Sequence, residues 1–499
     1  MTTVAAPADR PIGPPPVGPS RTHTIRSWTV FGALVVLLIG SSTAIFLPLQ
    51  PQAIGGAALV LMMVLLLLRV PVAMTMMIPS FAGLYALRGE KTVFSALSSL
   101  PYHQVASWTL SVVPMFVLMG LLMWKSGLTA NLYTVARHWL GWLPGGLAVG
   151  TNVAGAGLAA VSGSTTGTAY ALGRIGIPEM LKAGYDRRLA VGAVIVAGLP
   201  GQLIPPSILL VLYAGIAEVP VGKQLLAGVG PGILVAILFS IAIILYSVFG
   251  KDLAGPNRGR STEVVPWKEK FDSLAKAWPI PVLIFVIVGG MLSGVFTATE
   301  AGAVAALCSV GVVFALKGRS GGALRALTDG AIGTVSTVGA VFLLLVGVEA
   351  LSRMMILSGI SNGFADIITR LDLGRVEFVL LMMVVDLVLG AFMEPLPMMV
   401  LTIPILIPTL AHLDISLLWF GAFTVFMGEL AILAPPVGVL AMVIHSITKD
   451  PEVNLGRNIQ LKDVFMASLW FLPMAVVVVL ILILFPEIAT FLPDHSSGG

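Results

Sequence analysis

The sequence predicts an all-α integral membrane protein, a polytopic helical bundle. Charged residues make up only 10% of the 499 residues and hydrophobic residues 57%, whereas a soluble domain carries about 25% charged residues. The stretches 30–68, 189–217 and 224–250 contain no Asp, Glu, Lys or Arg, and each can hold a spanning helix of about 20 residues. The apolar residues do not alternate in the roughly ten-residue segments of a transmembrane β-barrel, so we expect spanning helices.

The N-terminal segment divides into a tail and a helix. Residues 1–27 are rich in proline and polar residues, so we expect a disordered cytoplasmic tail. Residues 28–47 then form an extra N-terminal transmembrane helix. Arg21 and Arg26 precede this apolar run as in a signal peptide. The run is long, however, and no small-residue cleavage site follows it, which favours an uncleaved helix.

The basic loops predict which ends of the helices face the cytoplasm. The linker 251–276 contains six Lys and Arg residues, and residues 174–188 contain four. The positive-inside rule places both segments in the cytoplasm, and one helix out and one helix back connect them. The last basic loop, 449–462, is followed by residues 464–499, a last transmembrane helix near 464–485 and a tail. This arrangement also places the N-terminus in the cytoplasm.

An internal repeat is indicated by landmarks that recur in the same order. The pairs are Ser126 with Ser358, Ser162 with Glu394, and Pro205 with Pro435. Their spacings are 232 (358 − 126 and 394 − 162) and 230 (435 − 205) residues. Loop charges orient the first repeat, 48–250, opposite to the second, 277–463. Inverted repeats are common in secondary transporters, with the site at their interface; chance similarity among Gly- and Leu-rich helices is the alternative.

Two interruptions in the first half predict a functional site. Residues 143–173 suggest a re-entrant hairpin whose tip carries Ser162, Ser164 and Thr165, and residues 189–216 a helix broken at Pro205-Pro206 before Ser207. The prolines free backbone carbonyls, which need a partner in lipid. A sodium ion, with hydroxyls completing its shell, is one such partner. The alternatives are a simple packing kink and close helix packing by small residues.

The second half repeats this plan with two carboxylates. A hairpin at 375–410 contains Glu394, and a broken helix at 417–446 contains Glu429. Carboxylates in apolar surroundings are costly within a membrane, so function is the first hypothesis for both. Alternatively, Glu429 pairs with a polar neighbour or reaches an aqueous cavity. Helix N-termini at these breaks offer N–H groups to a substrate carboxylate. Glu300 either caps a helix or belongs to the site.

Enzymatic and ATP-driven functions are disfavoured. The sequence has no HExxH, CxxC or P-loop motif, and these motifs carry much of the known metal, redox and phosphate chemistry. A membrane-embedded enzyme would need a catalytic pair, for which Glu394 with Ser162 is the one candidate. The net charge of +4 does not imply nucleic acid binding, because lysine and arginine act as topology signals in membrane proteins.

Several stretches together carry a family resemblance. They are VPMFVLMGLLMWKSGL, VSGSTTGTAYALGRIGIPEMLKAGYD, GQLIPPSILLVLYAG, GVFTATEAGAVAA and LAPPVGVLAMV. With them the chain resembles the large membrane subunit of tripartite ATP-independent periplasmic (TRAP) transporters. The resemblance implies a sodium-driven elevator-type transporter of the bacterial inner membrane, similar to the ion transporter superfamily. It also implies a separate small four-helix membrane subunit, a periplasmic binding protein, and carboxylate substrates such as C4-dicarboxylates, keto acids or sialic acid.

The resemblance also implies the site residues. The sodium-site candidates are Ser162, Gly163, Ser164, Thr165, Pro205, Ser207, Glu394, Ala434, Pro435 and Gly438. The substrate-site candidates are Thr166, Thr168, Gln202, Pro206 and Glu429. Glu394 stands where the family often has aspartate, and Ala434 where it often has threonine, which removes a hydroxyl from the second sodium shell. The alternative function is a self-sufficient sodium/anion symporter that needs no binding protein.

Overall fold

The computed structural model describes residues 21–250, 252–261, 265–318, 321–391, 393–434 and 438–496. Every regular element within these ranges is a helix, which confirms the all-α fold class. The elements in chain order are α1 (Arg21–Ile45), α2 (Pro51–Leu67), α3 (Val72–Arg88), α4 (Glu90–Val105), η1 (Thr109–Ser111), α5 (Val112–Ser126), α6 (Leu128–Leu140), α7 (Gly146–Ser162), α8 (Thr165–Lys182), α9 (Arg187–Ala197), η2 (Pro200–Gln202), α10 (Ile208–Ile216), α11 (Val221–Phe249), η3 (Pro256–Gly259), α12 (Trp267–Ala277), α13 (Pro279–Leu292), α14 (Ala298–Lys317), α15 (Ala323–Ser358), α16 (Ile360–Arg370), α17 (Arg375–Gly390), α18 (Pro395–His412), α19 (Leu417–Ala431), α20 (Val439–Ile447), α21 (Pro451–Asn454), α22 (Leu461–Leu484) and α23 (Glu487–Asp494).

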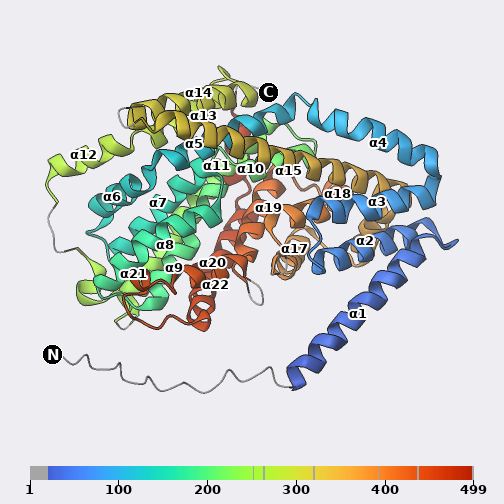
Figure 1. The fold of residues 1–499 in the computed structure, drawn as a ribbon, viewed down its shortest axis with the longest axis horizontal. Coiled ribbons are helices and arrows are strands. Elements are labelled where there is room, and N and C mark those ends of the chain that lie inside the picture. Colours follow the sequence, from blue (N-terminus) through green and yellow to red (C-terminus); the bar gives the residue numbers. More distant parts are fainter. Residues whose placement is uncertain are drawn as a thin grey trace, which may run out of the picture.

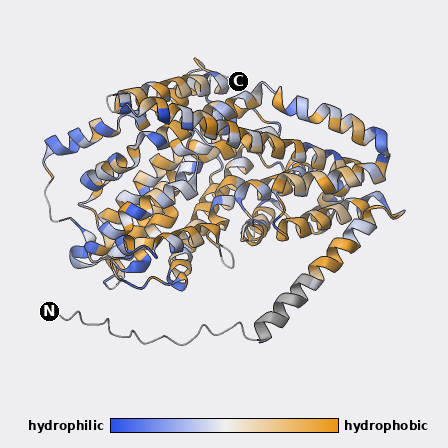
Figure 2. Cartoon of the chain, viewed as in Figure 1, coloured by the Kyte–Doolittle hydropathy of each residue, from blue (hydrophilic) through white to orange (hydrophobic). Residues whose placement is uncertain are grey.

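Several helices are long and apolar enough to cross a membrane. Among the described residues these are α11, α14, α15, α18 and α22. Two further spans are possible if each bent helix pair counts as one: α5 with α6, bent by 73°, and α12 with α13, bent by 57°. Figure 2 shows the hydrophobic colour on most helices and the hydrophilic colour on α12 and on the loops beside α8 and α21. This distribution fits a multi-pass protein whose charges gather at helix ends.

The helices pack in two groups (Figure 1). In the first helix group, defined as α2–α5, α14 and α15, α15 packs along α3 and α5, and α14 along α5. In the second helix group, defined as α7–α11, α17–α20 and α22, α9 packs against α7, α8 and α22, and α19 against α17, α18 and α11. α6 follows α5 after Gly127 and packs on α7, while α16 follows α15 after Gly359 and packs on α18. These two short helices connect the groups.

Two segments differ from the sequence-based expectation. α1 begins at Arg21 rather than at residue 28. The mostly polar residues before the apolar run thus belong to the same helix as the run itself. Residues 1–20 of the expected tail lie outside the described ranges. The linker 251–276 was expected to be a loop, but it contains η3 and the eleven-residue helix α12. Glu300 caps α14 in a reciprocal capping box with Thr297, so the capping interpretation holds for this residue.

Salt bridges and hydrogen bonds join the α8–α9 turn to the segment before α22. Arg174 pairs with Asp450 at 2.8 Å, and Arg187 pairs with the nearly buried Asp463 at 3.3 Å. Arg457 donates to the carbonyl oxygens of Leu181 and Tyr185 at 2.9 and 3.1 Å. The Tyr185 hydroxyl donates to the carbonyl of Gly259, and burial raises the pKa of this phenol. The two sequence halves are therefore held together at this end of the second helix group.

Glycines permit the closest helix contacts in the second helix group. A methyl group at Gly390 of α17 would lie 2.2 Å from the Cβ of Ala431 in α19. A methyl group at Gly201 in η2 would lie 2.5 Å from the backbone nitrogen of Ala160 in α7. Real Cβ atoms do not approach so closely, so both positions require glycine for the present packing.

We predict that Gly390→Ala destabilises the fold, because α17 and α19 must separate to admit the methyl group. Overpacking of this kind typically costs about 1–3 kcal/mol. The matched control is Gly311→Ala in α14, where a methyl group would meet nothing within 4 Å. Thermal unfolding in detergent should show a lower melting temperature for Gly390→Ala alone. Equal melting temperatures for the two variants would contradict the packing argument.

Candidate functional site

The tip of the first hairpin is a glycine–serine turn between α7 and α8. Gly163 ends α7 with a φ of 64°, a left-handed conformation that glycine adopts without strain. Ser164 is the N-cap of α8, and its Oγ accepts a hydrogen bond from the Gly167 N–H at 3.0 Å. This cap satisfies one of the N–H groups that a helix start leaves open. The sequence Ser-Gly-Ser therefore encodes the turn directly.

The hydroxyl groups at this tip differ in exposure. Ser162 Oγ lies 3.3 Å from Thr168 Oγ1. Thr165 and Thr168 are buried, whereas Ser164 and Thr166 are exposed. The tip thus presents several oxygen atoms within one and a half helical turns, as a site for a hard cation or a polar ligand requires.

The first broken helix consists of α9, η2 and α10. Pro205 and Pro206 are buried and joined by a cis peptide bond. Ser207, also buried, is the N-cap of α10, and its Oγ accepts from the Leu210 N–H at 3.2 Å. Gln202 is buried in η2, and its Oε1 has no hydrogen-bond partner among the described residues. The break therefore holds both a capped helix start and an acceptor without a partner.

The hairpin tip and the broken helix meet. A methyl group at Gly163 would lie 2.9 Å from the Cδ1 of Ile208, the first residue of α10. A methyl group at Gly198, just after α9, would lie 2.8 Å from the Cγ2 of Thr165. The structure thus brings the candidate residues Gly163 and Thr165 to the two sides of the break.

The second half has the same plan. Glu394 is the N-cap residue of α18 but makes no side-chain capping bond, and its side chain is exposed. After α19, Ala434 is partly buried, and Gly438 precedes α20 with a φ of 49°. Pro435 lies outside the described residues, so its predicted role at this break remains a prediction.

One hydrogen bond joins the two halves at this site. Thr165 Oγ1, in the first turn of α8, donates to Glu429 Oε2 of α19 at 2.5 Å. Glu429 is 4% exposed, and its neighbour Gly428 packs against Pro395, the residue after Glu394. Of the two alternatives for Glu429, pairing with a polar neighbour is the one observed. The sequence did not reveal this partner, because 264 residues separate the two positions.

Matched contacts recur with a spacing of 230 residues. The pair Gly198 and Thr165 corresponds to Gly428 and Pro395, whose Cβ atoms would lie 2.8 Å apart (428 − 198 = 230; 395 − 165 = 230). Both halves therefore place a glycine of the broken helix against the first residue after the hairpin turn. The N-caps Ser164 and Glu394 also differ by 230. The sequence alignment had paired Glu394 with Ser162, but Ser164 is its counterpart in helix position.

Asp386 is a buried carboxylate that was not among the candidate residues. It is fully buried in α17, and neither carboxylate oxygen has a hydrogen-bond partner among the described residues. Phe378, Met382 and Gly390 are also buried. With Asp386 they recur every fourth residue and define the packed face of the helix. The sequence placed Asp386 on a helix face lining protein rather than lipid, and the structure confirms its burial.

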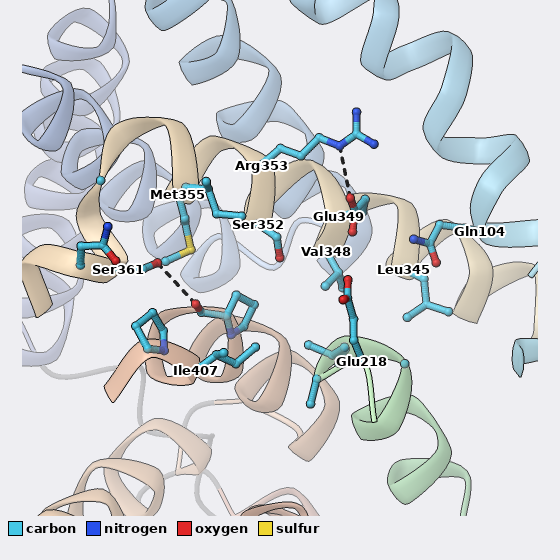
Figure 3. Close-up of a pocket in the computed structure, with 18 residues that line it drawn as sticks. Gln104, Glu218, Leu345, Val348, Glu349, Ser352, Arg353, Met355, Ser361 and Ile407 are labelled. Carbon is cyan, nitrogen blue, oxygen red and sulfur yellow. Dashed lines mark hydrogen bonds and ion pairs between the residues drawn. The ribbon is translucent and has the colours of Figure 1, made fainter. Parts of the chain in front are cut away.

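A cavity of about 360 Å³ lies away from the candidate residues, between α15, α16, α18 and the α10–α11 turn. Figure 3 shows Glu218 and Ser352 directed into it, with Arg353 bonded to Glu349. The distance from Arg353 Nε to Glu349 Oε1 is 3.2 Å. None of the predicted sodium or substrate residues lines this cavity. Its charged lining consists of two glutamates and one arginine.

Comparison with known proteins identifies the family. The model of the tripartite ATP-independent periplasmic transporter, DctM component, matches residues 59–488. The chain belongs to this family. It is thus a large membrane subunit of a TRAP transporter, a transporter component rather than an enzyme, and a multi-pass protein of the inner membrane.

Curated relatives of this large TRAP subunit differ in the substrates their names state. The C4-dicarboxylate large permease protein DctM of Pseudomonas aeruginosa is 32% identical over 78% of this chain and 86% of its own length. The sialic acid permease protein SiaT of Haemophilus influenzae is 27% identical over 88% of this chain and 68% of its own length. The ectoine large permease protein TeaC of Halomonas elongata is 27% identical over 86% of this chain and 96% of its own length.

Two solved structures share the fold of the large TRAP subunit. The YdaH transporter of Alcanivorax borkumensis matches with a TM-score of 0.56 at 14% identity, covering 82% of this chain and 89% of its own. MtrF of Neisseria gonorrhoeae matches with a TM-score of 0.57 at 12% identity, covering 89% and 97%. At these identities the likeness concerns the arrangement of helices alone.

We predict an energetic coupling between Thr165 and Glu429. Hydrogen bonds to charged groups contribute about 1.5–3 kcal/mol, so Thr165→Val and Glu429→Gln should be non-additive in a double-mutant cycle. Thermal or denaturant unfolding of the wild type, the two single variants and the double variant measures this coupling. Thr166→Val, at the exposed neighbouring position, is the matched control and should show no coupling with Glu429→Gln. Because the amide that replaces the Glu429 carboxylate still offers an acceptor oxygen to Thr165, the cycle measures the part of the coupling that depends on the carboxylate charge. Full additivity of the Thr165 and Glu429 variants would contradict a hydrogen bond to a charged carboxylate.

Proposed function

We propose that this large TRAP subunit is the translocating component of a sodium-coupled importer of organic acid anions. In this proposal a periplasmic binding protein delivers the substrate, and a separate small four-helix membrane subunit completes the transporter. The observation that carries the proposal is the meeting of both sequence halves at interrupted helices, where Thr165 of the first hairpin bonds Glu429 of the second broken helix. Secondary transporters place ion and substrate sites at such interruptions.

The oxygen atoms of the first half support a sodium site. Ser162, Ser164 and Ser207 supply hydroxyl oxygens beside the break. An N-cap oxygen that accepts one hydrogen bond keeps a second lone pair. The two prolines have no N–H group to donate to the carbonyl oxygens one turn earlier. A sodium ion would coordinate these carbonyl oxygens instead. In the second half we assign Glu394 and the backbone around Gly438 to the corresponding site, with Ala434 contributing no side-chain oxygen.

The substrate is proposed to bind between the hairpin tips. The start of α8 directs backbone N–H groups toward this region, and such helix starts attract carboxylates. Thr166, Thr168, Gln202 and Pro206 would line the substrate site, with Glu429 orienting Thr165. The 360 Å³ cavity is a poorer site for an anion, because Glu218 and Glu349 outnumber Arg353 in its lining. The names of the relatives support an organic acid or zwitterion as substrate.

The proposed mechanism is an elevator movement of the second helix group against the first. Most packing lies within each group, and α6 and α16 connect the two groups alongside direct contacts of α5 with α7 and α10 and of α15 with α18. Each connecting helix begins after a glycine with positive φ, Gly127 or Gly359, and such residues accommodate a change of chain direction. The inverted orientation of the repeats would then expose the site alternately to the two sides of the membrane.

Uptake into proteoliposomes tests this proposal. The chain is co-reconstituted with the neighbouring small subunit, and labelled C4-dicarboxylates, keto acids, sialic acid and ectoine are supplied with the cognate binding protein under an inward sodium gradient. We expect uptake that requires both the gradient and the binding protein. Uptake by this chain alone would favour a self-sufficient symporter, and uptake unaffected by sodium would contradict the coupling ion.

We predict that Ser164→Ala and Glu394→Gln weaken sodium-driven uptake, raising the sodium concentration needed for half-maximal rate. Loss of one oxygen ligand or one charge from the shell is the physical reason. The matched controls are Ser293→Ala and Glu377→Gln, both at exposed positions away from the hairpin tips. Melting temperatures near that of the wild type would show that all four variants fold. Unchanged sodium dependence in both site variants would disprove the assignment.

A further inference from the structure

Helix α12 carries an exposed apolar stripe. Trp267, Phe271, Leu274 and the following Trp278 are spaced by four, three and four residues, which places them on one side of a helix. Their exposed fractions are 67%, 55%, 40% and 48%. Large aromatic side chains in such number are rarely left in water, so this stripe has an occupant other than solvent.

The rest of the chain contacts α12 beside the stripe and at one edge of it. Ser273 and Ala277 of α12 are buried, and α12 packs on α6. Trp139 of α6 donates from Nε1 to the carbonyl oxygen of Lys270 at 3.2 Å and meets the Trp267 ring edge-on at 6.2 Å. Trp139 also meets the Phe271 ring edge-on at 5.8 Å. α6 therefore fixes the rotation of α12 about its axis and covers one edge of the stripe, while all four stripe side chains remain exposed.

Charged residues are distributed unevenly around α12. At about 100° per residue, Lys268 and Lys270 fall on the two flanks of the stripe, whereas Glu269, Asp272 and Lys276 fall on the opposite side, where the two anions outnumber the one cation. Lys270 Nζ lies 5.0 Å from the centre of the Trp267 ring. Cations at the border of an apolar face and anions opposite it are complementary to an anionic lipid surface, where lysines extend along apolar groups to reach the headgroups.

The position of α12 in the chain places it at a membrane boundary. It leads directly into α13 with a bend of 57°, and α13 packs against the candidate spanning helix α14. The segment that contains α12 is the most basic loop of the sequence and is assigned to the cytoplasm by the positive-inside rule. Headgroups of the cytoplasmic leaflet carry net negative charge.

We propose that α12 lies in the cytoplasmic interface of the membrane and binds anionic phospholipid headgroups through Lys268 and Lys270, with Trp267, Phe271, Leu274 and Trp278 inserted among the acyl chains. This lipid site is distinct from the candidate sodium and substrate sites. Through Trp139 it holds α6, one of the two helices that connect the helix groups, at the membrane surface.

Hydrogen exchange of the full-length protein in nanodiscs tests the proposal. Amides of residues 267–277 should exchange more slowly in phosphatidylcholine bilayers containing phosphatidylglycerol than in phosphatidylcholine alone. Lys268→Gln/Lys270→Gln should abolish this difference, a loss of up to about thirtyfold in protection for two lysines at an anionic surface. The matched control Lys449→Gln/Lys462→Gln removes the same charge from exposed positions in the last basic loop and should retain the difference.

The apolar stripe and the rival occupants are tested separately. Phe271→Ser/Leu274→Ser should speed amide exchange of α12 in both bilayers. Without these apolar side chains in the membrane, the helix opens more often and its amides exchange more readily. Equal exchange of the wild type in the two bilayers would overturn the proposal, as would full competition by soluble glycerol phosphate. Protection in phosphatidylcholine alone that appears only when the small membrane subunit is added would assign the stripe to a protein partner instead and overturn the lipid site.

Discussion

The constraint on which the structure depends is the need to satisfy backbone groups where helices are interrupted in an apolar environment. Lipid offers no hydrogen bonds to a free N–H or carbonyl. The chain meets this need at the start of α8 and α10 with serine caps, Ser164 and Ser207, whose oxygens accept backbone N–H groups. The prolines before Ser207 have no N–H to satisfy. A helix can be interrupted in the membrane only where local partners satisfy its free backbone groups. The serine oxygens that do so keep a lone pair for a ligand.

Close packing by glycine is the second requirement, because it brings the interruptions of both halves to one place. Gly198 lets the broken helix contact Thr165, and Gly428 lets its counterpart contact Pro395. Thr165 is thereby positioned to donate to Glu429 across the two halves. A carboxylate buried without a donor would carry a large desolvation cost, so Glu429 and the packing at Gly198 depend on each other.

The sequence predicted the helical class and the interruptions, because both are encoded locally. A deficit of charge indicates a membrane protein, Gly163 and Ser164 are a glycine C-cap followed by a serine N-cap, and the helices break around Pro205 and Pro206. The residues that face each other could not be predicted in the same way. The Thr165–Glu429 bond depends on how two distant helices pack, and the pairing of Glu394 shifted from Ser162 to Ser164 once N-cap positions were known. Helix α12 was missed because a search for long apolar runs overlooks an eleven-residue amphipathic helix.

The first helix group contacts the hairpin tip of the candidate site through a glycine. Gly120 of α5 faces the end of α7, where a methyl group would lie 3.0 Å from the carbonyl oxygens of Val161 and Ser162. The first helix group therefore presents backbone rather than a side chain to the hairpin tip, which leaves no interdigitated side chain at this point to resist sliding. The opposite end of the second helix group is joined by ion pairs such as Arg174 with Asp450. Ion pairs thus join the two sequence halves within the second helix group, whereas at Gly120 the first helix group meets that group through backbone, an arrangement compatible with the proposed movement of the second helix group as one body.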